Sequence, residues 1–177
     1  MILARLFRRK SDGQHVESVY TAIVEAARRP ILYEDYQVAD TLDGRFDMVI
    51  LHAFLVMDRL KEGDAEAHTF SQQLADHIFL EMDRAFREMG VGDLSVAKRV
   101  RKLAEIFYGR VGAYAPAITA GGTELAEALR RNVYPEDVAP EALAGLVRYV
   151  TIQHEGLAKQ QPAKIAQGEL HFPEVPA

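Results

Sequence analysis

The stretch RFDMVILHAFLVMDRL, Arg45 to Leu60, decides the fold class of this chain. Its apolar residues lie on nearly every side of a 3.6-residue helix, as a central bundle helix requires when neighbours cover several of its faces. The longest apolar run, Met48 to Met57, is interrupted by His52 and is about half the roughly 20 residues that a membrane-spanning helix needs. We therefore predict a buried helix at the centre of an all-α bundle, with His52 as a hydrogen-bonded core residue.

The rest of the chain continues this pattern. Apolar residues recur at intervals of three and four, and alternating β-branched runs bounded by turn signals are missing. This predicts a single-domain, irregular bundle of about six helices. The expected helices are 15–29, 45–60, 69–89, one that begins after the GVGD sequence at 90–93, 123–132 and 140–157. The expected segments are a basic and apolar N-terminal segment, 1–14, a helical domain, 15–158, and a mobile C-terminal tail, 159–177.

Composition excludes several classes of protein. The chain has 177 residues, 49% of them hydrophobic, which is enough for one domain with a real core. Its 21 Lys and Arg and 26 Asp and Glu give a net charge of −5, so overall charge does not favour binding to DNA. It has no cysteine, which excludes disulfide scaffolds, thiol nucleophiles and Cys-based metal sites. The N-terminus lacks the pattern of a secretory signal, so we expect the protein in the cytoplasm.

A second informative stretch is REMGVGDLSVAKRVRKLAEIFYGRVGAY, residues 87–114. Gly90 and Gly92 do not form a nucleotide-binding loop, because no strand precedes them and no Lys followed by Ser or Thr comes after them. Gly90 instead fits a left-handed helix terminator after Met89, and Asp93 or Ser95 fits the cap of the next helix. Both glycines are therefore predicted to be structural.

The helix that follows this corner has two distinct faces. Apolar residues from Val96 to Tyr114 fall on one side, and a row of cations falls on the other. The basic face is either solvated or a docking surface for an acidic partner, an RNA backbone or lipid head groups. Two glycines on it favour a partner, since each costs helix stability of roughly 1 kcal/mol against Ala and permits close approach. The predicted partner-binding residues of this helix are Lys98, Arg99, Arg101, Lys102, Gly109 and Gly112.

Two further segments are candidate surfaces. The connector 30–44 contains Tyr33 and Tyr36 among acidic residues, and we predict that both tyrosines bind a partner. The N-terminal MILARLFRRK either packs as a first helical turn, frays, or anchors weakly in the membrane interface. The residues expected to touch the membrane are Ile2, Leu3, Leu6, Phe7, Arg8, Arg9 and Lys10.

Catalytic and metal-binding chemistry has little support. His77 shares a helix face with Glu81, but Asp76 and Asp83 point elsewhere, and helical metal ligands need a common face. We therefore predict structural roles for Asp76 and His77, and no metal or other cofactor. No glycine-flanked serine nucleophile or clear acid–base pair appears, so we do not expect an enzyme.

Three stretches together resemble a known family. They are LYEDYQVADTLDGRFDMVILHAFLVMDRL at 32–60, the run from Phe70 to Tyr114, and LAEALRRNVY at 125–134. The most specific parts are Asp76-His77-x-Phe79, the helix end at 84–92, Gly112-Ala113-Tyr114 and Leu129-Arg130-Arg131-Asn132. They resemble the ubiquinol-cytochrome c chaperone family, whose mitochondrial members assist the making and assembly of cytochrome b, and the form found here looks bacterial.

The resemblance implies an α-helical, non-enzymatic assembly factor for the respiratory ubiquinol-cytochrome c reductase. It would bind cytochrome b or an early assembly intermediate, on the cytoplasmic side of the inner membrane and in peripheral contact with it. Mitochondrial members work with a small partner protein and associate with the ribosome. The resemblance therefore implies a small partner protein as a candidate partner, and it leaves contact with the ribosome open. The rival hypotheses are a helical interaction module with another client and an unrecognised hydrolase or haem-handling enzyme.

Overall fold

The computed structural model describes the backbone of residues 2–175 and, within it, the side chains of 13–93 and 95–175. The described backbone is helical and contains no strand, which confirms the all-α prediction. Six helices are long: α1 Ile2–Ala27, α3 Leu42–Leu60, α4 Ala65–Glu88, α5 Asp93–Ala120, α6 Gly122–Val133 and α7 Pro140–Ala158. Two are short, α2 Pro30–Glu34 and α8 Pro162–Ala166. Within residues 2–175, no helix is long and apolar enough to cross a membrane.

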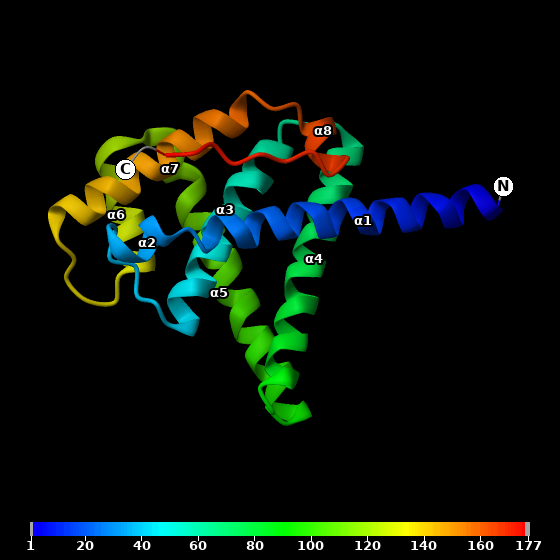
Figure 1. Cartoon of the computed structure of the whole chain (residues 1–177), viewed down its shortest axis with the longest axis horizontal. Coiled ribbons are helices and arrows are strands. Elements are labelled where there is room, and N and C mark those ends of the chain that lie inside the picture. Colours follow the sequence, from blue (N-terminus) through cyan, green and yellow to red (C-terminus); the bar gives the residue numbers. More distant parts are fainter. Residues whose placement is uncertain (1, 176–177) are drawn as a thin grey trace.

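Helix α3 lies at the centre, as its sequence predicts (Figure 1). It contacts α1, α4, α5, α6, α7 and α8, and its residues from Phe46 to Val56 are all buried. His52 is fully buried, and its Nδ1 lies 2.7 Å from the Met48 carbonyl oxygen. Because that oxygen can only accept, Nδ1 carries the proton and Nε2 accepts from the Tyr149 hydroxyl, 2.7 Å away. The prediction of a hydrogen-bonded core histidine is confirmed.

The C-terminal segment, predicted to be a mobile tail, makes specific contacts with the bundle. Residues 168–175, here called the C-terminal strap, run back along the bundle (Figure 1). Arg29, the residue before α2, donates to the carbonyl oxygens of Phe172 at 2.9 Å and Pro173 at 2.7 Å, and Gln153 donates to Pro173 at 2.9 Å. The Phe172 side chain is 5% exposed. The described part of the segment after residue 158 therefore packs on the bundle, and the domain boundaries stay a prediction.

Helices α4 and α5 form a hairpin whose far half extends away from the other helices (Figure 1). We call this half, residues 79–108, the arm. Gly90 has φ of +78°, and the amides of Gly90 and Val91 donate to the carbonyls of Arg87 and Phe86, which confirms the predicted helix terminator. The predicted side-chain cap of α5 is wrong. Gly92 occupies the N-cap without a side-chain hydrogen bond, and Asp93 instead pairs with Arg87.

A candidate docking surface on the α4–α5 arm

An apolar groove of about 300 Å³ lies between the start of α3 and the arm. Its apolar lining includes Leu42, Met82, Phe86, Met89, Leu103 and Ile106. Leu42 is 61% exposed and Met89 is 52% exposed, whereas Leu74 and Ile78, earlier on α4, are fully buried. Large apolar side chains left open together in a concave surface are typical of an interaction site.

Cations from α5 border this groove. Arg99 and Lys102 line it, and the Arg99 guanidinium carbon lies 5.6 Å from the centre of the Phe86 ring. Lys98 and Arg101 are exposed on the same helix and have no ion pair with any of the side chains that the structure describes. Lys102 has only a long contact of 3.5 Å with Glu105. The predicted basic face is therefore exposed, and its role as a docking face stays a prediction.

The arginines of α4 behave differently. Arg84 pairs with Glu81, and Arg87 contacts Asp83 at 2.6 Å and also Asp93. Acids on α4 and at the hairpin corner thus neutralise the cations of α4. The positive charge of the arm that remains available to a partner is concentrated on α5.

Gly109 and Gly112 lie on the exposed side of α5, beyond the cations. A Cβ atom placed on either would meet nothing within 4 Å. No intramolecular contact therefore requires glycine at these positions. Their role in letting a partner approach stays a prediction.

The connector tyrosines make contacts within the chain, and their predicted role in binding a partner stays a prediction. Tyr36 is 4% exposed, and its ring centre lies 6.0 Å from that of Tyr149. Its main-chain carbonyl accepts from the Tyr134 hydroxyl at 2.6 Å. Tyr33 is half-buried, its hydroxyl donates to the Ala27 carbonyl at 2.5 Å, and burial raises the pKa of Tyr33. Both tyrosines fasten the connector to the core, which explains its unusual aromatic content.

His77 connects two helices. Its Nε2 lies 3.1 Å from the Glu17 carboxylate of α1, and its ring meets the edge of Tyr20 at 5.0 Å between centres. Asp76 is exposed beside it. Among the residues with described side chains, no group of three His, Cys, Asp or Glu could hold a metal ion. The contact with Glu17 is the kind that a structural histidine makes, and no pattern in the sequence indicates this partner about 60 positions away.

A buried ion pair holds the base of the arm against α3, and sequence reasoning did not identify it. Arg110 of α5 donates to Asp47 of α3, which is 9% exposed. Burial raises the pKa of Asp47 to about 6, against the opposing effect of Arg110. Arg110, which flanks the basic face in sequence, therefore serves the interior and not a partner.

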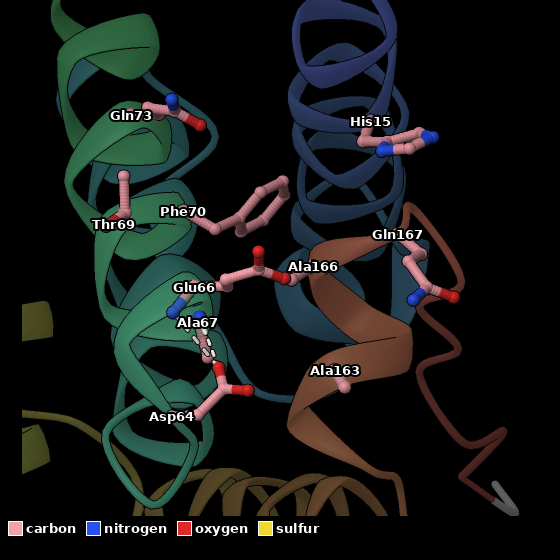
Figure 2. A pocket seen from close by; sticks show the side chains of 10 residues that line it. All are labelled: His15, Asp64, Glu66, Ala67, Thr69, Phe70, Gln73, Ala163, Ala166 and Gln167. Atoms are coloured by element: carbon pink, nitrogen blue, oxygen red, sulfur yellow. Dashed lines mark hydrogen bonds between the residues drawn. The ribbon is translucent and has the colours of Figure 1, made fainter. Parts of the chain in front are cut away.

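A second cavity, of about 350 Å³, lies between α1, α4 and α8 (Figure 2). Its polar lining includes His15, Asp64, Gln73 and Gln167. Asp64 is already used as the cap of α4, since its carboxylate accepts from the amides of Glu66 and Ala67 at 3.0 Å (Figure 2). The cavity holds no arrangement of nucleophile and base among its lining residues, so the arm remains the stronger candidate.

Comparison with known proteins agrees with the sequence resemblance. The model of the ubiquinol-cytochrome C chaperone family matches residues 34–172. The chain is 26% identical to the ubiquinol-cytochrome-c reductase complex assembly factor 1 of Xenopus laevis over 76% of its length and 68% of that protein. It is 24% identical to the Mus musculus protein of the same name, over 78% of this chain and only 48% of the mouse protein.

A solved structure extends the match to almost the whole chain. The crystal structure of the Cbp3 homolog from Brucella abortus is 40% identical, covers 98% of this chain and 97% of its own, and superposes with a TM-score of 0.84. Helix α3, the connector from residue 34 onward and the strap up to residue 172 fall within the residues that the family model matches. The chain belongs to the ubiquinol-cytochrome C chaperone family.

Proposed function

We propose that the chain is a non-enzymatic assembly chaperone for the ubiquinol-cytochrome c reductase, and that its client is cytochrome b or an early assembly intermediate containing it. Family membership and the names of the Xenopus and mouse relatives support the reductase as the target. A small partner protein and the ribosome are further partners that the family raises. We propose cytochrome b, or an intermediate that contains it, as the client, and the small protein and the ribosome as candidate partners.

The observation that carries the proposal is the open apolar groove bordered by exposed cations of α5. A membrane protein that has not yet been assembled exposes apolar helices of about 20 residues, which need cover until their final neighbours arrive. A groove with exposed Leu42 and Met89 supplies such cover, and two of its walls come from the α4–α5 hairpin, which extends away from the other helices (Figure 1).

The described titratable side chains support a non-enzymatic role. His52, Asp47 and Asp64 are each occupied by a structural partner: the Tyr149 hydroxyl, Arg110 and the start of α4, respectively. None of them faces the apolar groove. The groove therefore offers contact and charge, and no group arranged for proton transfer or nucleophilic attack.

Weak membrane contact through the N-terminal segment is a further part of the proposal. The side chains of Ile2, Leu3, Leu6, Phe7, Arg8, Arg9 and Lys10 lie outside the described residues. Their backbone belongs to α1, whose first half points away from the bundle (Figure 1). We expect flotation with anionic liposomes to show partial binding that falls with salt and with deletion of residues 1 to 10. Equal flotation of both proteins at both salt concentrations would remove this part.

In-cell crosslinking of lysines, followed by mass spectrometry, tests the client. In cells that make the reductase, Lys98 and Lys102 should crosslink to cytochrome b or to other reductase subunits. Lys159, which is exposed at the end of α7, is the matched control and should not. Crosslinks from Lys98 and Lys102 to unrelated proteins alone would contradict the proposed client.

A further inference from the structure

The groove on the arm has a shape and a charge distribution that restrict what it can bind. We propose that it binds an amphipathic α-helix that places apolar side chains in the groove and carries acidic residues along the edge facing α5. The inference deepens the proposed function and rests on it for the identity of the client surface.

The size of the groove indicates a helix seated on its rim. At about 300 Å³ it is far too small to enclose a helix, whose diameter with side chains is roughly 10–12 Å. It can take anchor side chains at helical spacing while the backbone of the ligand stays outside. Its concave wall is built from three elements, the start of α3 with α4 and α5. A lipid surface fits a flat or convex apolar face better than such a hollow.

The lining indicates tolerance for different apolar sequences. Met82 and Met89 come from α4, and methionine side chains adapt to partners of different shape because they are unbranched and flexible. Leu42, the first residue of α3, is the most exposed of the apolar lining residues. A groove of this kind binds apolar side chains of different shapes and does not require one particular residue type.

Charge then selects among apolar helices. Arg99 and Lys102 line the groove from α5, with Lys98 and Arg101 exposed on the same helix, whereas the α3 side contributes Asp43. A ligand with acids toward α5 gains favourable contacts there, and one with bases toward α5 is repelled. The same argument excludes the chain's own N-terminal MILARLFRRK as the occupant, because its charges are all positive.

Synthetic peptides test the inference on the intact protein. The probe is a fluorescent helical peptide of about 18 residues, roughly five turns, with leucines at helical spacing and glutamates along one edge of the leucine stripe. Its control has lysines in place of the glutamates. We expect the glutamate peptide to bind with a Kd about tenfold or more below that of the lysine peptide, as measured by fluorescence anisotropy.

Matched variants locate the binding. Met89→Asp should weaken binding of the glutamate peptide about tenfold or more, because a buried anchor contact is lost and an anion is added. Leu80→Asp is the control, since Leu80 is 47% exposed on α4 and does not line the groove. Lys102→Glu should weaken the same peptide, and Lys159→Glu should not. Circular dichroism and a thermal melt of each variant show whether it is folded as the wild type is.

Two results with the wild type would overturn the inference: no binding of either peptide, or equal binding of both. Two results with the variants would also overturn it: an equal loss of peptide affinity in Met89→Asp and Leu80→Asp, or a protein that binds anionic liposomes but no peptide, with liposome binding lost in Met89→Asp. The proposed function fails separately. If the peptides behave as expected but no reductase subunit crosslinks to the arm, the groove specificity stands and the client is wrong. If cytochrome b crosslinks to the arm but the peptides do not bind, the function stands and the helical ligand is wrong.

Discussion

The C-terminal strap and the arm treat apolar surface in opposite ways. The strap buries Phe172 to 5% exposure, with its ring 5.2 Å from that of His52, and Pro173 packs so closely on α7 that a Cβ at Gly156 would lie 2.1 Å from it. The groove between the arm and the start of α3 leaves Leu42 and Met89 more than half exposed. Apolar surface covered by the same chain stabilises the fold, whereas apolar surface left open is available to stabilise a complex.

Cations in the two regions show the same contrast. The Arg29 guanidinium donates hydrogen bonds to two carbonyl oxygens of the strap and lies 3.5 Å from the Tyr149 hydroxyl. Lys98 and Arg101 of the arm have no such partner among the described side chains. The cation of the body is therefore bound within the chain, whereas the cations of α5 on the arm are exposed and accessible to a ligand.

Truncation of Phe172 should give the largest effect on stability. Phe172→Ala removes a buried aromatic ring and should lower the free energy of unfolding by about 3–5 kcal/mol. Met89→Ala, at the exposed groove, should cost about 1 kcal/mol or less. Urea denaturation of both variants measures the difference. Similar costs at the two positions would remove the contrast between a closed and an open apolar region.

The anchors of the two regions should respond to pH in opposite directions. Burial lowers the pKa of His52, beneath the strap, from 6.5 to about 4. The unfolded chain therefore binds this proton first, and stability is lost as the pH falls from about 6.5 to 4. Burial raises the pKa of Asp47, at the base of the arm, from 3.8 to about 6, so the folded chain binds that proton first and gains stability as the pH falls through the same range.

The two effects have opposite signs, so in the wild type they act against each other. Asp47→Asn removes the stabilising contribution. We expect its stability, measured by urea denaturation between pH 7 and 4, to fall more steeply with acidification than that of the wild type. Parallel pH profiles of the two proteins would show that Asp47 does not titrate in this range.

A glycine in the closed region should be intolerant of a methyl group. A Cβ at Gly145 of α7 would lie 2.5 Å from Cε1 of Tyr36, the buried ring of the connector. Gly145→Ala should therefore lower the free energy of unfolding by about 1–3 kcal/mol, because the ring must shift in a packed core. An unchanged melting temperature would mean that the connector is held less firmly than its burial indicates.

A glycine in the open region should behave in the opposite way. A Cβ at Gly109 meets nothing within 4 Å, so Gly109→Ala should raise the free energy of unfolding by up to about 1 kcal/mol through helix propensity. If a partner approaches α5 closely, the same variant should also reduce reductase assembly in cells. A stabilised variant with unchanged assembly would refute the predicted role of this glycine in partner binding.

The fold could be predicted largely from the periodic segments. The central position of α3 follows from apolar residues on all its faces, and Gly90 follows from helix-ending chemistry. The strap could not be predicted in this way. It is fixed by side chains such as Arg29 and Gln153 that bind its main-chain carbonyls, and such contacts leave no period in the strap's own sequence.

The candidate site was only half visible in the sequence. The cations of α5 are recognisable from their spacing on one helix face. The groove beside them is not, because Met89 lies on the same apolar stripe as Phe70, which is buried. Only the extension of the arm beyond the bundle distinguishes them, and that depends on which neighbours are present at each turn. The burial of the Tyr36 ring likewise depends on a neighbour distant in sequence, because the ring occupies the space beside Gly145.

Reversal of the α5 charges tests the central claim most directly, namely that the open face of the arm serves the reductase. The triple variant Lys98→Glu, Arg101→Glu and Lys102→Glu should keep its thermal stability, because exposed charges contribute about 0–1 kcal/mol each. The account predicts that cells carrying it contain clearly less assembled reductase, while a Lys159→Glu control assembles normally. A normal level of assembled reductase, with the triple variant folded and expressed as the wild type is, would contradict the account.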